Sequence, residues 1–364
     1  MPLKKIAIIG AKSLPAHGGA ASTIESLISN LDSSFELSVY LMGDVGSAEQ
    51  IARFKPIHIK VPGIKRINTL TYYLGSMIHA LLKGDYDIIH VHHIYAGFIV
   101  PFLRLRYKVV TTVHGIIPQD DNKWNKLDKL IFRSIEKISL YFSSAVVSVS
   151  KPQIKYLRIL QSRKINYIPN GVDQIAAEQY MNTASTQTIL TFSAARIIRL
   201  KGCDLFLRAL KQINYRDKVL IIGDMEQVSA YKNEILSLAQ NLEVEFTGLI
   251  RSKEQLYHKL AISTIFIFPS TKEGLSNMLL EVASLGIPIV CSDIPENQAV
   301  FNSQEVLFFK NRDAADLAEK IDYALHHRDE LLQRAILATK KVETYYPWSR
   351  IAEEYKQVFL DLLA

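Results

Sequence analysis

Short runs of β-branched and aliphatic residues alternate with longer helical patterns along the whole sequence. This alternation is typical of β-α units, which build parallel sheets covered by helices on both faces. Two of the runs, 87–92 and 264–268, are almost continuously apolar, as expected of strands that are buried on both faces. The sequence therefore predicts an α/β fold.

Two such domains are expected, because the chain has 364 residues and a domain usually holds about 100–200. The segment 170–187 opens with Asn-Gly and is rich in Ala, Thr, Ser and Gln, so it is predicted to link two doubly wound parallel-sheet domains, 1–172 and 173–345. A last helix over 346–364, capped by Ser349, is expected to cross back to the first domain. The strands are expected near 4–10, 36–41, 57–61, 87–92, 108–113, 145–149, 165–168, 188–193, 218–222, 244–247, 264–268, 288–292 and 306–309.

The composition excludes disordered and disulfide-stabilised chains. Hydrophobic residues make up 48% of the sequence and charged residues 22%, and the two cysteines cannot build a disulfide framework. A reducing cytoplasm fits this cysteine content. The longest uncharged apolar stretch, 94–103, has ten residues, against about 20 for a membrane-spanning helix. The sequence therefore predicts a cytoplasmic protein without a spanning segment.

The basic excess belongs to one half of the chain. The net charge is +7, but residues 1–170 carry 22 Lys and Arg against 11 Asp and Glu, whereas 171–364 carry 21 against 25. This asymmetry indicates an anionic partner for the first half: a nucleic acid, a phosphorylated small molecule or an anionic membrane surface. Nucleic acid is the poorer explanation, because no known nucleic-acid-binding motif is found.

The loop after the first strand differs from the common nucleotide-binding loops. It lacks G-x-G-x-x-G, and the acidic residue expected after the second strand is missing, so a nicotinamide dehydrogenase is disfavoured. A P-loop sequence is also absent. Gly18 and Gly19 nevertheless precede a predicted helix over 20–31, where a phosphate or sugar can approach bare backbone N–H groups. A simple tight turn is the alternative.

A second candidate residue, His114, follows the fifth predicted strand and precedes a glycine. At the carboxyl edge of the predicted sheet its imidazole could hydrogen-bond a substrate hydroxyl, although a structural turn histidine is as good an interpretation. A metal site at His90, His92 and His93 is disfavoured, because no carboxylate and histidine pair follows at ligand spacing and the strand puts only His90 and His92 on one face. The sequence Asp85-Tyr86-Asp87 fits a metal-binding D-x-D, but it precedes its strand, so Asp87 is predicted to be structural. We expect no metal.

The strongest pattern is the segment 268–288. Gly274 permits a tight turn into a helix that begins near Ser276 and stops at Gly286, and its first N–H groups could face an anion. Glu273 and Glu281 stand eight residues apart, so that their carboxylates could accept hydrogen bonds from two hydroxylated rings that flank a diphosphate. Arg196 and Lys201 lie between another strand and helix, where they could neutralise that diphosphate.

Taken together, these motifs resemble those of the retaining, nucleotide-sugar-dependent glycosyltransferases of family 4, which have the GT-B fold. The resemblance runs nearly end to end, and its first third is similar to the bacterial surface-polysaccharide branch often described as rhamnosyltransferase-like. The motifs, in chain order, are Leu14-Pro15 with Gly18-Gly19, Asp87-Ile88-Ile89-His90-Val91-His92, Thr112-Val113-His114-Gly115, Ile168-Pro169-Asn170-Gly171-Val172-Asp173, Arg196 with Lys201-Gly202, Thr247-Gly248, and Glu273 to Glu281.

The resemblance implies roles for these residues in the cleft between two Rossmann-like domains. Arg196 and Lys201 would bind the leaving diphosphate, Glu273 the hydroxyls of the donor sugar, Glu281 the ribose, and His114 the sugar near its reacting carbon. The other residues implied in donor binding are Gly18, Gly19, Leu249, Ile250, Gly274, Leu275, Ser276 and Asn277.

The implied activity is that of a retaining hexosyltransferase in cell-surface polysaccharide or glycolipid biosynthesis. It would move a sugar from a UDP-, GDP- or dTDP-sugar to a glycan or lipid-linked saccharide, without a metal or other cofactor. A nucleotide-sugar epimerase of GT-B fold and a non-catalytic scaffold subunit are the alternatives. The ordered motifs favour a transferase over an epimerase, and the joint presence of His114, Arg196, Lys201, Glu273 and Glu281 argues against a scaffold.

The basic first half suggests where the acceptor is met. On a helix predicted near 124–142, Lys126, Lys129, Arg133 and Lys137 form a stripe, diluted by two acidic residues, Asp128 and Glu136. An ordinary solvated helix face is one interpretation. The other is that this helix and the loop containing Lys65 and Arg66 rest on an anionic membrane, on the cytoplasmic face of the inner membrane. The donor, the linkage and the oligomeric state are left open.

Overall fold

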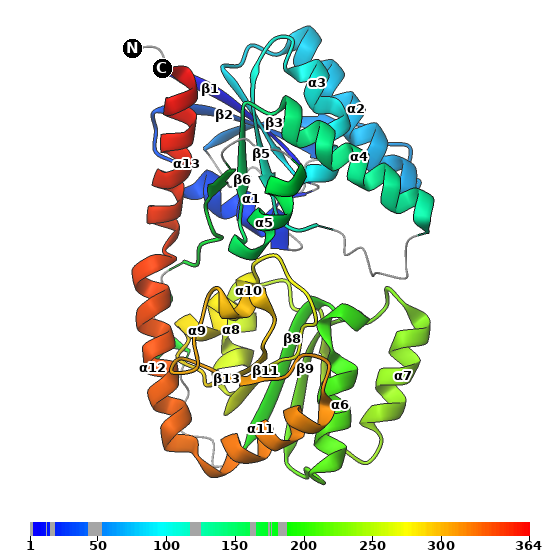
Figure 1. Ribbon diagram of the computed structural model, residues 1–364, viewed down its shortest axis with the longest axis vertical. Helices are drawn as coiled ribbons and strands as arrows, with labels where there is room; N and C mark the ends of the chain where they lie inside the picture. Colours follow the sequence, from blue (N-terminus) through cyan, green and yellow to red (C-terminus); the bar gives the residue numbers. More distant parts are fainter. Residues whose placement is uncertain are drawn as a thin grey trace. The chain divides into compact units, whose positions relative to one another are not determined.

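The computed structural model describes residues 3–11, 13–14, 19–42, 53–116, 125–160, 165–173, 175, 177–180 and 188–364. The chain divides into two compact units (Figure 1). Unit 1 comprises Met1–Gly171 and Trp348–Ala364, and unit 2 comprises Val172–Pro347. Each unit is built around its own parallel sheet.

Unit 1 contains a seven-stranded sheet in the order β3-β2-β1-β4-β5-β6-β7. All of its strand pairs are parallel. Strand β1 is flanked by β2 and β4, so the strand order reverses direction there, and ligands of doubly wound sheets usually bind at such a reversal. The strands are β1 (Lys4–Ile9), β2 (Phe35–Met42), β3 (Phe54–Ile59), β4 (Ile88–His92), β5 (Lys108–Val113), β6 (Ala145–Ser148) and β7 (Ile165–Tyr167).

Helices bury both faces of this sheet. On one face α1 and the C-terminal helix α13 pack together, and Phe359 of α13 is fully buried beside Phe35 of β2. On the other face α2 contributes the buried rings of Tyr72 and Tyr73. The helices are α1 (Gly19–Asn30), α2 (Lys65–Lys83), α3 (Val100–Leu103), α4 (Lys126–Phe142), α5 (Lys151–Leu160) and α13 (Trp348–Leu363), with a 3-10 helix at Ile94–Ile99.

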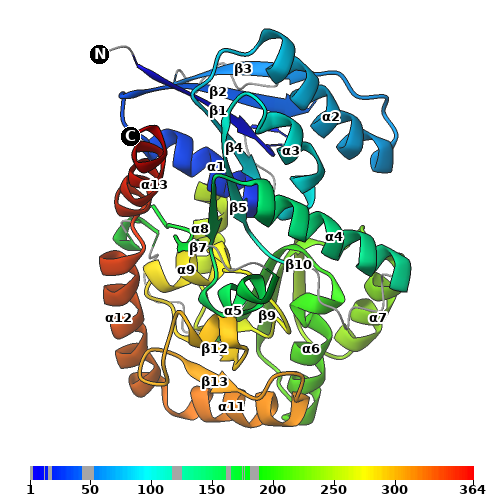
Figure 2. The same ribbon diagram turned by 45° about the horizontal axis from the view of Figure 1, so that its top comes forward.

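Unit 2 contains a six-stranded parallel sheet in the order β10-β9-β8-β11-β12-β13, and its order reverses between β8 and β11. Figure 2 shows α11 lying along β13 at one end of this unit. The strands are β8 (Ile189–Arg196), β9 (Lys218–Asp224), β10 (Val244–Gly248), β11 (Ile265–Phe268), β12 (Ile289–Ser292) and β13 (Leu307–Phe309). The helices are α6 (Cys203–Gln212), α7 (Ser229–Ala239), α8 (Lys253–Ala261), α9 (Asn277–Ser284), α10 (Pro295–Gln298), α11 (Ala314–His326) and α12 (Arg328–Tyr345).

The predicted α/β class is confirmed, with one parallel sheet in each unit. Each predicted strand is present, and β3 begins three residues earlier than expected, at Phe54. The predicted cap of the last helix is wrong. Helix α13 begins at Trp348, whose buried ring packs on Gly171, so Ser349 lies inside the first turn instead of before it.

Candidate functional site

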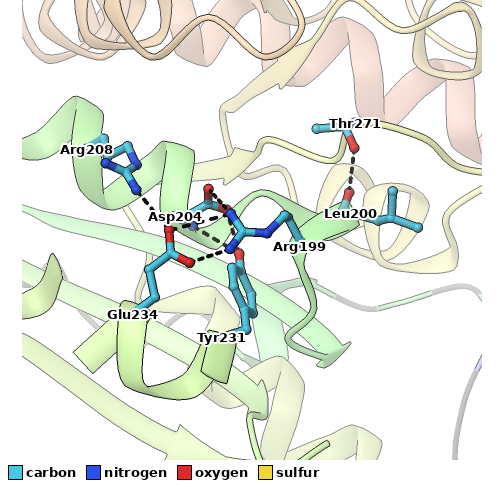
Figure 3. Close-up of polar contacts among 7 residues, drawn as sticks. All are labelled: Arg199, Leu200, Asp204, Arg208, Tyr231, Glu234 and Thr271. Carbon is cyan, nitrogen blue, oxygen red and sulfur yellow. Dashed lines mark hydrogen bonds and ion pairs between the residues drawn. The ribbon is translucent and has the colours of Figure 1, made fainter. Parts of the chain in front are cut away.

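In unit 2, two loops meet where the strand order reverses. One follows β8 and the other follows β11. The backbone N–H of Thr271 donates to the carbonyl oxygen of Leu200 at 2.8 Å (Figure 3). Gly202 has a φ of +72°, and a Cβ at that position would lie 2.1 Å from the carbonyl oxygen of Pro269. Only glycine allows this approach, so these contacts hold the two loops together.

This approach brings Lys201 and Glu273 into direct contact. The Lys201 Nζ lies 2.5 Å from the Glu273 Oε1, and the two side chains retain 26% and 11% of their exposure. Both residues were singled out from the sequence, but their pairing was not predicted. The ammonium group has three donors, so it can hold the carboxylate and an anionic ligand at once.

Arg196 is the last residue of β8 and is exposed. Its guanidinium makes no hydrogen bond or ion pair with any residue that the structure describes. The N–H of the next residue, Ile197, donates to the carbonyl oxygen of Asp224 at 2.8 Å, which fixes the chain as it leaves the strand. Arg196 thus provides an unengaged positive charge at the carboxyl edge of the sheet.

A network around Arg199 braces the same loop (Figure 3). The Arg199 guanidinium pairs with Glu234 and lies 3.3 Å from Asp204, over the ring of Tyr231. Glu234 also accepts from Arg208 at 2.8 Å, and the hydrogen bond from Arg199 keeps the pKa of Glu234 below its ordinary value. The sequence analysis gave Arg199 no role, because only the fold shows that its side chain contacts Glu234 and Tyr231 of α7.

Helix α9 begins where the sequence predicted it. Ser276 is its N-cap, and its hydroxyl accepts from the backbone N–H of Leu279 at 3.4 Å. Gly274 and Leu275 precede the cap, and Leu275 packs on the core of the unit. Asn277 is the first helical residue. The positive end of the helix dipole favours an anion near the start of α9.

Glu281 lies on α9 with 12% of its side chain exposed. Burial raises its pKa, and the Lys253 ammonium, 3.9 Å away, acts in the opposite direction. Lys253 also lies 3.0 Å from Asp173. The sequence reasoning missed Lys253, although a lysine that begins the helix after the Thr247-Gly248 motif was a usable signal.

The loop after β10 carries Leu249 and Ile250, two of the residues that the resemblance implies in donor binding. Gly248 turns the chain with a φ of +70°. Leu249 is exposed, whereas Ile250 packs against the core cluster that contains Leu279. Lys253 then begins α8 and reaches Glu281, so this loop and α9 are joined through one ion pair.

In unit 1, His114 follows β5, next to the end of β4. Its Nε2 lies 2.9 Å from the Nδ1 of His92, and the ring is half-buried. Burial holds the pKa of His114 well below the ordinary value of 6.5, and the neighbouring histidines act in the same direction. The imidazole is therefore neutral near pH 7.

The structure describes one residue of the Gly18-Gly19 pair and both aspartates of the D-x-D sequence. Gly19 is the first residue of α1, whereas Gly18 lies outside the described residues. The Asp87 carboxylate accepts from the backbone N–H of Lys5 at 2.8 Å, and Asp85 pairs with the Lys5 side chain. These contacts agree with a structural role for Asp87. Among the residues described, no group of His, Cys, Asp and Glu side chains could hold a metal ion.

The basic residues on α4 lie as predicted, with one correction. Lys126, Arg133 and Lys137 are exposed and Lys129 is half-buried. Glu136 does not dilute this stripe, because it is buried and accepts from the hydroxyls of Tyr95 and Tyr156 at 2.9 and 2.8 Å. The prediction that Lys65 and Arg66 lie in a loop is wrong, because they are the first two residues of α2; their side chains lie outside the described part. Within the described ranges no helix is long and apolar enough to span a membrane.

Known proteins share this architecture. The sucrose-phosphate synthase of Thermosynechococcus elongatus superposes with a TM-score of 0.84 over 99% of each chain, at 20% identity. HepE of Anabaena, solved with UDP and glucose, gives 0.80 over 98% of this chain and 100% of its own, at 15% identity. The O-antigen biosynthesis glycosyltransferase WclY of Escherichia coli is 25% identical, covering 94% of this chain and 95% of its own.

Two family models match consecutive parts of the sequence. The model described as Glycosyltransferase Family 4 matches residues 17–174, and the model described as Glycosyl transferases group 1 matches residues 178–342. The matched parts include the loops after β5, β8 and β11 that carry His114, Lys201 and Glu273. The chain belongs to the family 4 glycosyltransferases of GT-B fold.

Proposed function

We propose that this enzyme transfers a sugar from a nucleotide-sugar donor to a lipid-linked saccharide, with retention of the anomeric configuration, during synthesis of a cell-surface polysaccharide. The name of WclY, an O-antigen biosynthesis glycosyltransferase, supports the pathway class. The complex of HepE with UDP and glucose supports a nucleotide-sugar donor. The rhamnosyltransferase-like branch stays a prediction.

The observation that carries this proposal is the contact between Lys201 and Glu273 beside the start of α9. Arg196 at the end of β8 and Lys201 in the loop that follows provide two positive charges, and the dipole of α9 adds a positive helix end, so a diphosphate is the anion that fits this edge. The Glu273 carboxylate can accept hydrogen bonds from sugar hydroxyls. Glu281, eight residues further along the same segment, would accept a hydrogen bond from the ribose.

The transfer follows from these roles. The bond between the anomeric carbon and the β-phosphate oxygen breaks, and its electron pair leaves with the diphosphate, where Arg196 and Lys201 stabilise the charge. The acceptor hydroxyl bonds to the anomeric carbon on the same face, and its proton passes to the departing phosphate oxygen. His114 hydrogen-bonds the donor sugar near the reacting carbon. No protein nucleophile or metal ion is required in this scheme.

Replacing Lys201 tests the assignment. We expect Lys201→Met to lower kcat/KM by about 100- to 1000-fold, the usual loss when a charge-stabilising donor is removed. The pair formed by Lys341 and Glu305 is a matched control, because its side chains have the same exposures, 26% and 11%, and a separation of 2.8 Å. Lys341→Met should leave transfer within about twofold of wild type. Equal effects of the two substitutions would overturn the role of Lys201.

The donor can be identified by ligand-induced stabilisation. UDP-, GDP- and dTDP-sugars are compared by thermal shift, because a bound donor raises the melting temperature by mass action. One nucleotide should stabilise the wild-type enzyme and should stabilise Lys201→Met less. If none of these donors shifts the melting temperature, and none supports transfer, the proposed function is wrong.

We further propose that unit 1 rests on an anionic membrane that holds the acceptor. The exposed face of α2 is apolar along its length, with exposures from 37% to 76%. The residues of this stripe are Ile67, Leu70, Leu74, Ile78 and Leu82. Their spacing of three or four residues puts them on one side of the helix. An apolar stripe on the solvent side is the reverse of an ordinary surface helix.

Helices α3 and α4 extend this surface, and α2, α3 and α4 pack in sequence within unit 1 (Figure 1). Phe102 on α3 and Leu105 just after it are 52% and 84% exposed, and Leu127 and Leu130 on α4 are 64% and 62% exposed. We call these residues, together with the α2 stripe, the apolar face. An amphipathic surface of this kind suits the boundary between lipid headgroups and acyl chains.

The basic residues around the apolar face favour an anionic lipid layer as its partner. Lys83 ends α2 and is exposed, Arg104 and Arg106 follow α3, and the basic stripe lies on α4. Helices α2 and α3 contain no acidic residue, and Asp128 is the only acidic residue of α4 besides the buried Glu136. A symmetric dimer through this face would bring like charges together, whereas anionic headgroups would neutralise them.

Vesicle sedimentation tests the membrane proposal. Wild-type protein should bind vesicles containing phosphatidylglycerol and bind phosphatidylcholine vesicles poorly, and salt should weaken the binding. Leu74→Glu with Ile78→Glu should reduce binding at least about tenfold. Leu332→Glu with Ile336→Glu on α12 is the control, because these leucine and isoleucine side chains have the same spacing and are 48% and 58% exposed. Binding that is absent, indifferent to salt, or equally lost in the control contradicts the proposal, as does dimerisation through α2.

A further inference from the structure

Two histidines behind His114 have no part in the proposed transfer. His90 and His92 lie on β4 and are fully buried. The rings of His92 and His114 are within 19° of coplanar, with centroids 5.2 Å apart, yet the Nδ1 of His92 lies only 2.9 Å from the Nε2 of His114. The two nitrogens therefore face each other edge to edge, as in an N–H···N hydrogen bond.

This hydrogen bond contains one proton. Burial holds the pKa of His92 and of His114 well below the ordinary value, so both rings are neutral near pH 7. A neutral imidazole has one N–H donor and one bare acceptor nitrogen. The position of the shared proton consequently fixes the tautomer of both rings.

The shared proton belongs either to His92 or to His114, and the surroundings of the other nitrogen of His92 decide between these two arrangements. Its Nε2 is buried and has no hydrogen-bond partner in the described part of the chain. If His114 donated, the proton of His92 would lie on this Nε2, as a buried N–H without an acceptor. If His92 donates from Nδ1, the Nε2 carries only a lone pair. Orphaned buried N–H groups are rarer than under-satisfied acceptors, which favours donation by His92.

We propose that His92 is a positioning residue that fixes the tautomer and orientation of His114. The Nδ1–H of His92 donates to the Nε2 of His114, and the proton of His114 therefore lies on its own Nδ1. His114 then presents a hydrogen-bond donor, and no base, to its ligand. The identity of that ligand as an oxygen of the donor sugar rests on the proposed function, whereas the tautomer does not.

Variants of His92 separate this role from general packing. In His92→Asn the amide nitrogen can occupy the place of Nδ1, so the donor is kept, whereas His92→Leu removes it. His90→Leu is the matched control for loss of a buried ring from the same strand. His90 bonds Thr112 at 2.8 Å through its Nε2, and no hydrogen bond joins it to His114 within the described chain.

Nitrogen NMR of the full chain with ¹⁵N-labelled histidine reads the tautomer directly. In the wild type the Nδ1 of His114 should be protonated and its Nε2 bare, also in His90→Leu and His92→Asn, whereas His92→Leu should give a mixture. The signals of His114 are assigned by their loss in His114→Gln. A protonated Nε2 in the wild type would overturn the proposal, and this measurement needs neither a variant of His92 nor a substrate.

Kinetics then tests the consequence for transfer. His92→Leu should lower kcat about tenfold, the loss of one well-placed hydrogen bond, with KM for the acceptor unchanged. His92→Asn should recover most of that loss. Equal rates in the two variants would contradict a positioning role. If the wild type transfers no sugar while the NMR result holds, the proposed function fails and the tautomer assignment stands.

Discussion

At the scale of single residues, the candidate site of unit 2 combines charges whose surroundings differ. Arg196 is exposed and unengaged among the residues described, Lys201 is paired with Glu273, and Glu281 is largely buried near Lys253. At this edge of the sheet, the diphosphate of a nucleotide sugar would contact the cations, and its hydroxylated rings would contact the carboxylates. The buried carboxylate is the least favourable of these groups for folding, because burial disfavours its charged form.

Glu281→Gln should therefore make the fold more stable while weakening donor binding. Burial raises the pKa of Glu281 above its unfolded value, so the folded state binds the proton more tightly. The stabilisation from that proton is present at low pH and is lost as pH rises through the folded pKa. The glutamine variant cannot ionise, so its stability advantage in urea unfolding should grow from pH 5 to pH 8.

In the control variant, Glu245→Gln, the expected change in stability has the opposite sign. Pairing with Lys218 and Lys259 lowers the pKa of Glu245, so the stability from this ionised carboxylate is already present above its unfolded pKa. Glu245→Gln should therefore be less stable than wild type by a nearly constant amount from pH 5 to pH 8. Glu281→Gln should bind the nucleotide sugar about tenfold more weakly, through loss of a charge-assisted hydrogen bond. A glutamine variant at 281 that is less stable at pH 8 than at pH 5, relative to wild type, would refute the assignment.

At the scale of elements, the loop after β8 is shaped by a glycine and held by pairings between distant residues. Gly202, Gly248 and Gly286 have φ values of +72°, +70° and +70°. Of these three, only Gly202 would bring a Cβ against backbone, at the Pro269 carbonyl. The three positions therefore impose the same backbone penalty on alanine, and Gly202 imposes a clash in addition.

Gly202→Ala should destabilise unit 2 clearly more than Gly248→Ala. We expect about 1 kcal/mol for Gly248→Ala, from the left-handed backbone alone, and about 2–4 kcal/mol for Gly202→Ala. Because Lys201 is the adjacent residue, Gly202→Ala should also reduce kcat/KM, and Gly248→Ala should change it less. Denaturant midpoints and initial rates measure both effects. Similar losses of stability in the two variants would contradict the close approach of the loops.

The elements themselves were predictable, and several pairings were not. Runs such as 264–268 are apolar because both faces of a parallel strand are covered, so each strand was visible in the sequence. The start of α9 near Ser276 was also visible, because Gly274 permits the tight turn that precedes it. The burial of Glu136 was not, because its partners Tyr95 and Tyr156 lie 41 and 20 residues away. The pairing of Lys253 with Glu281 likewise depends on how α8 packs beside α9.

At the scale of the whole molecule, unit 1 depends on both ends of the chain. Helix α13 returns after unit 2 and buries Trp348, Ile351, Tyr355 and Phe359 against the first sheet. The Lys356 ammonium lies 2.7 Å from Asp32, just after α1. The core of unit 1 therefore includes a helix that follows unit 2 in the sequence.

Phe359→Ala should destabilise unit 1 by about 3–5 kcal/mol, the usual range for truncating a buried aromatic side chain. The neighbouring Leu360 is 40% exposed on the same helix, so Leu360→Ala should change stability by less than about 1 kcal/mol. Calorimetry of the full chain, with and without a donor that binds unit 2, separates the unfolding of the two units. A Phe359→Ala variant as stable as wild type would show that α13 does not complete the core.

The central claim is retaining sugar transfer, and the anomeric configuration of the product tests it most directly. The enzyme is incubated with the stabilising nucleotide sugar and a lipid-diphosphate-linked saccharide. The anomeric configuration of the new glycosidic bond is then determined by proton NMR. We predict a single new glycoside with the anomeric configuration of the donor, formed by the wild type and greatly reduced in Lys201→Met. A product of inverted configuration, or release of free sugar with no new glycoside, would contradict the account.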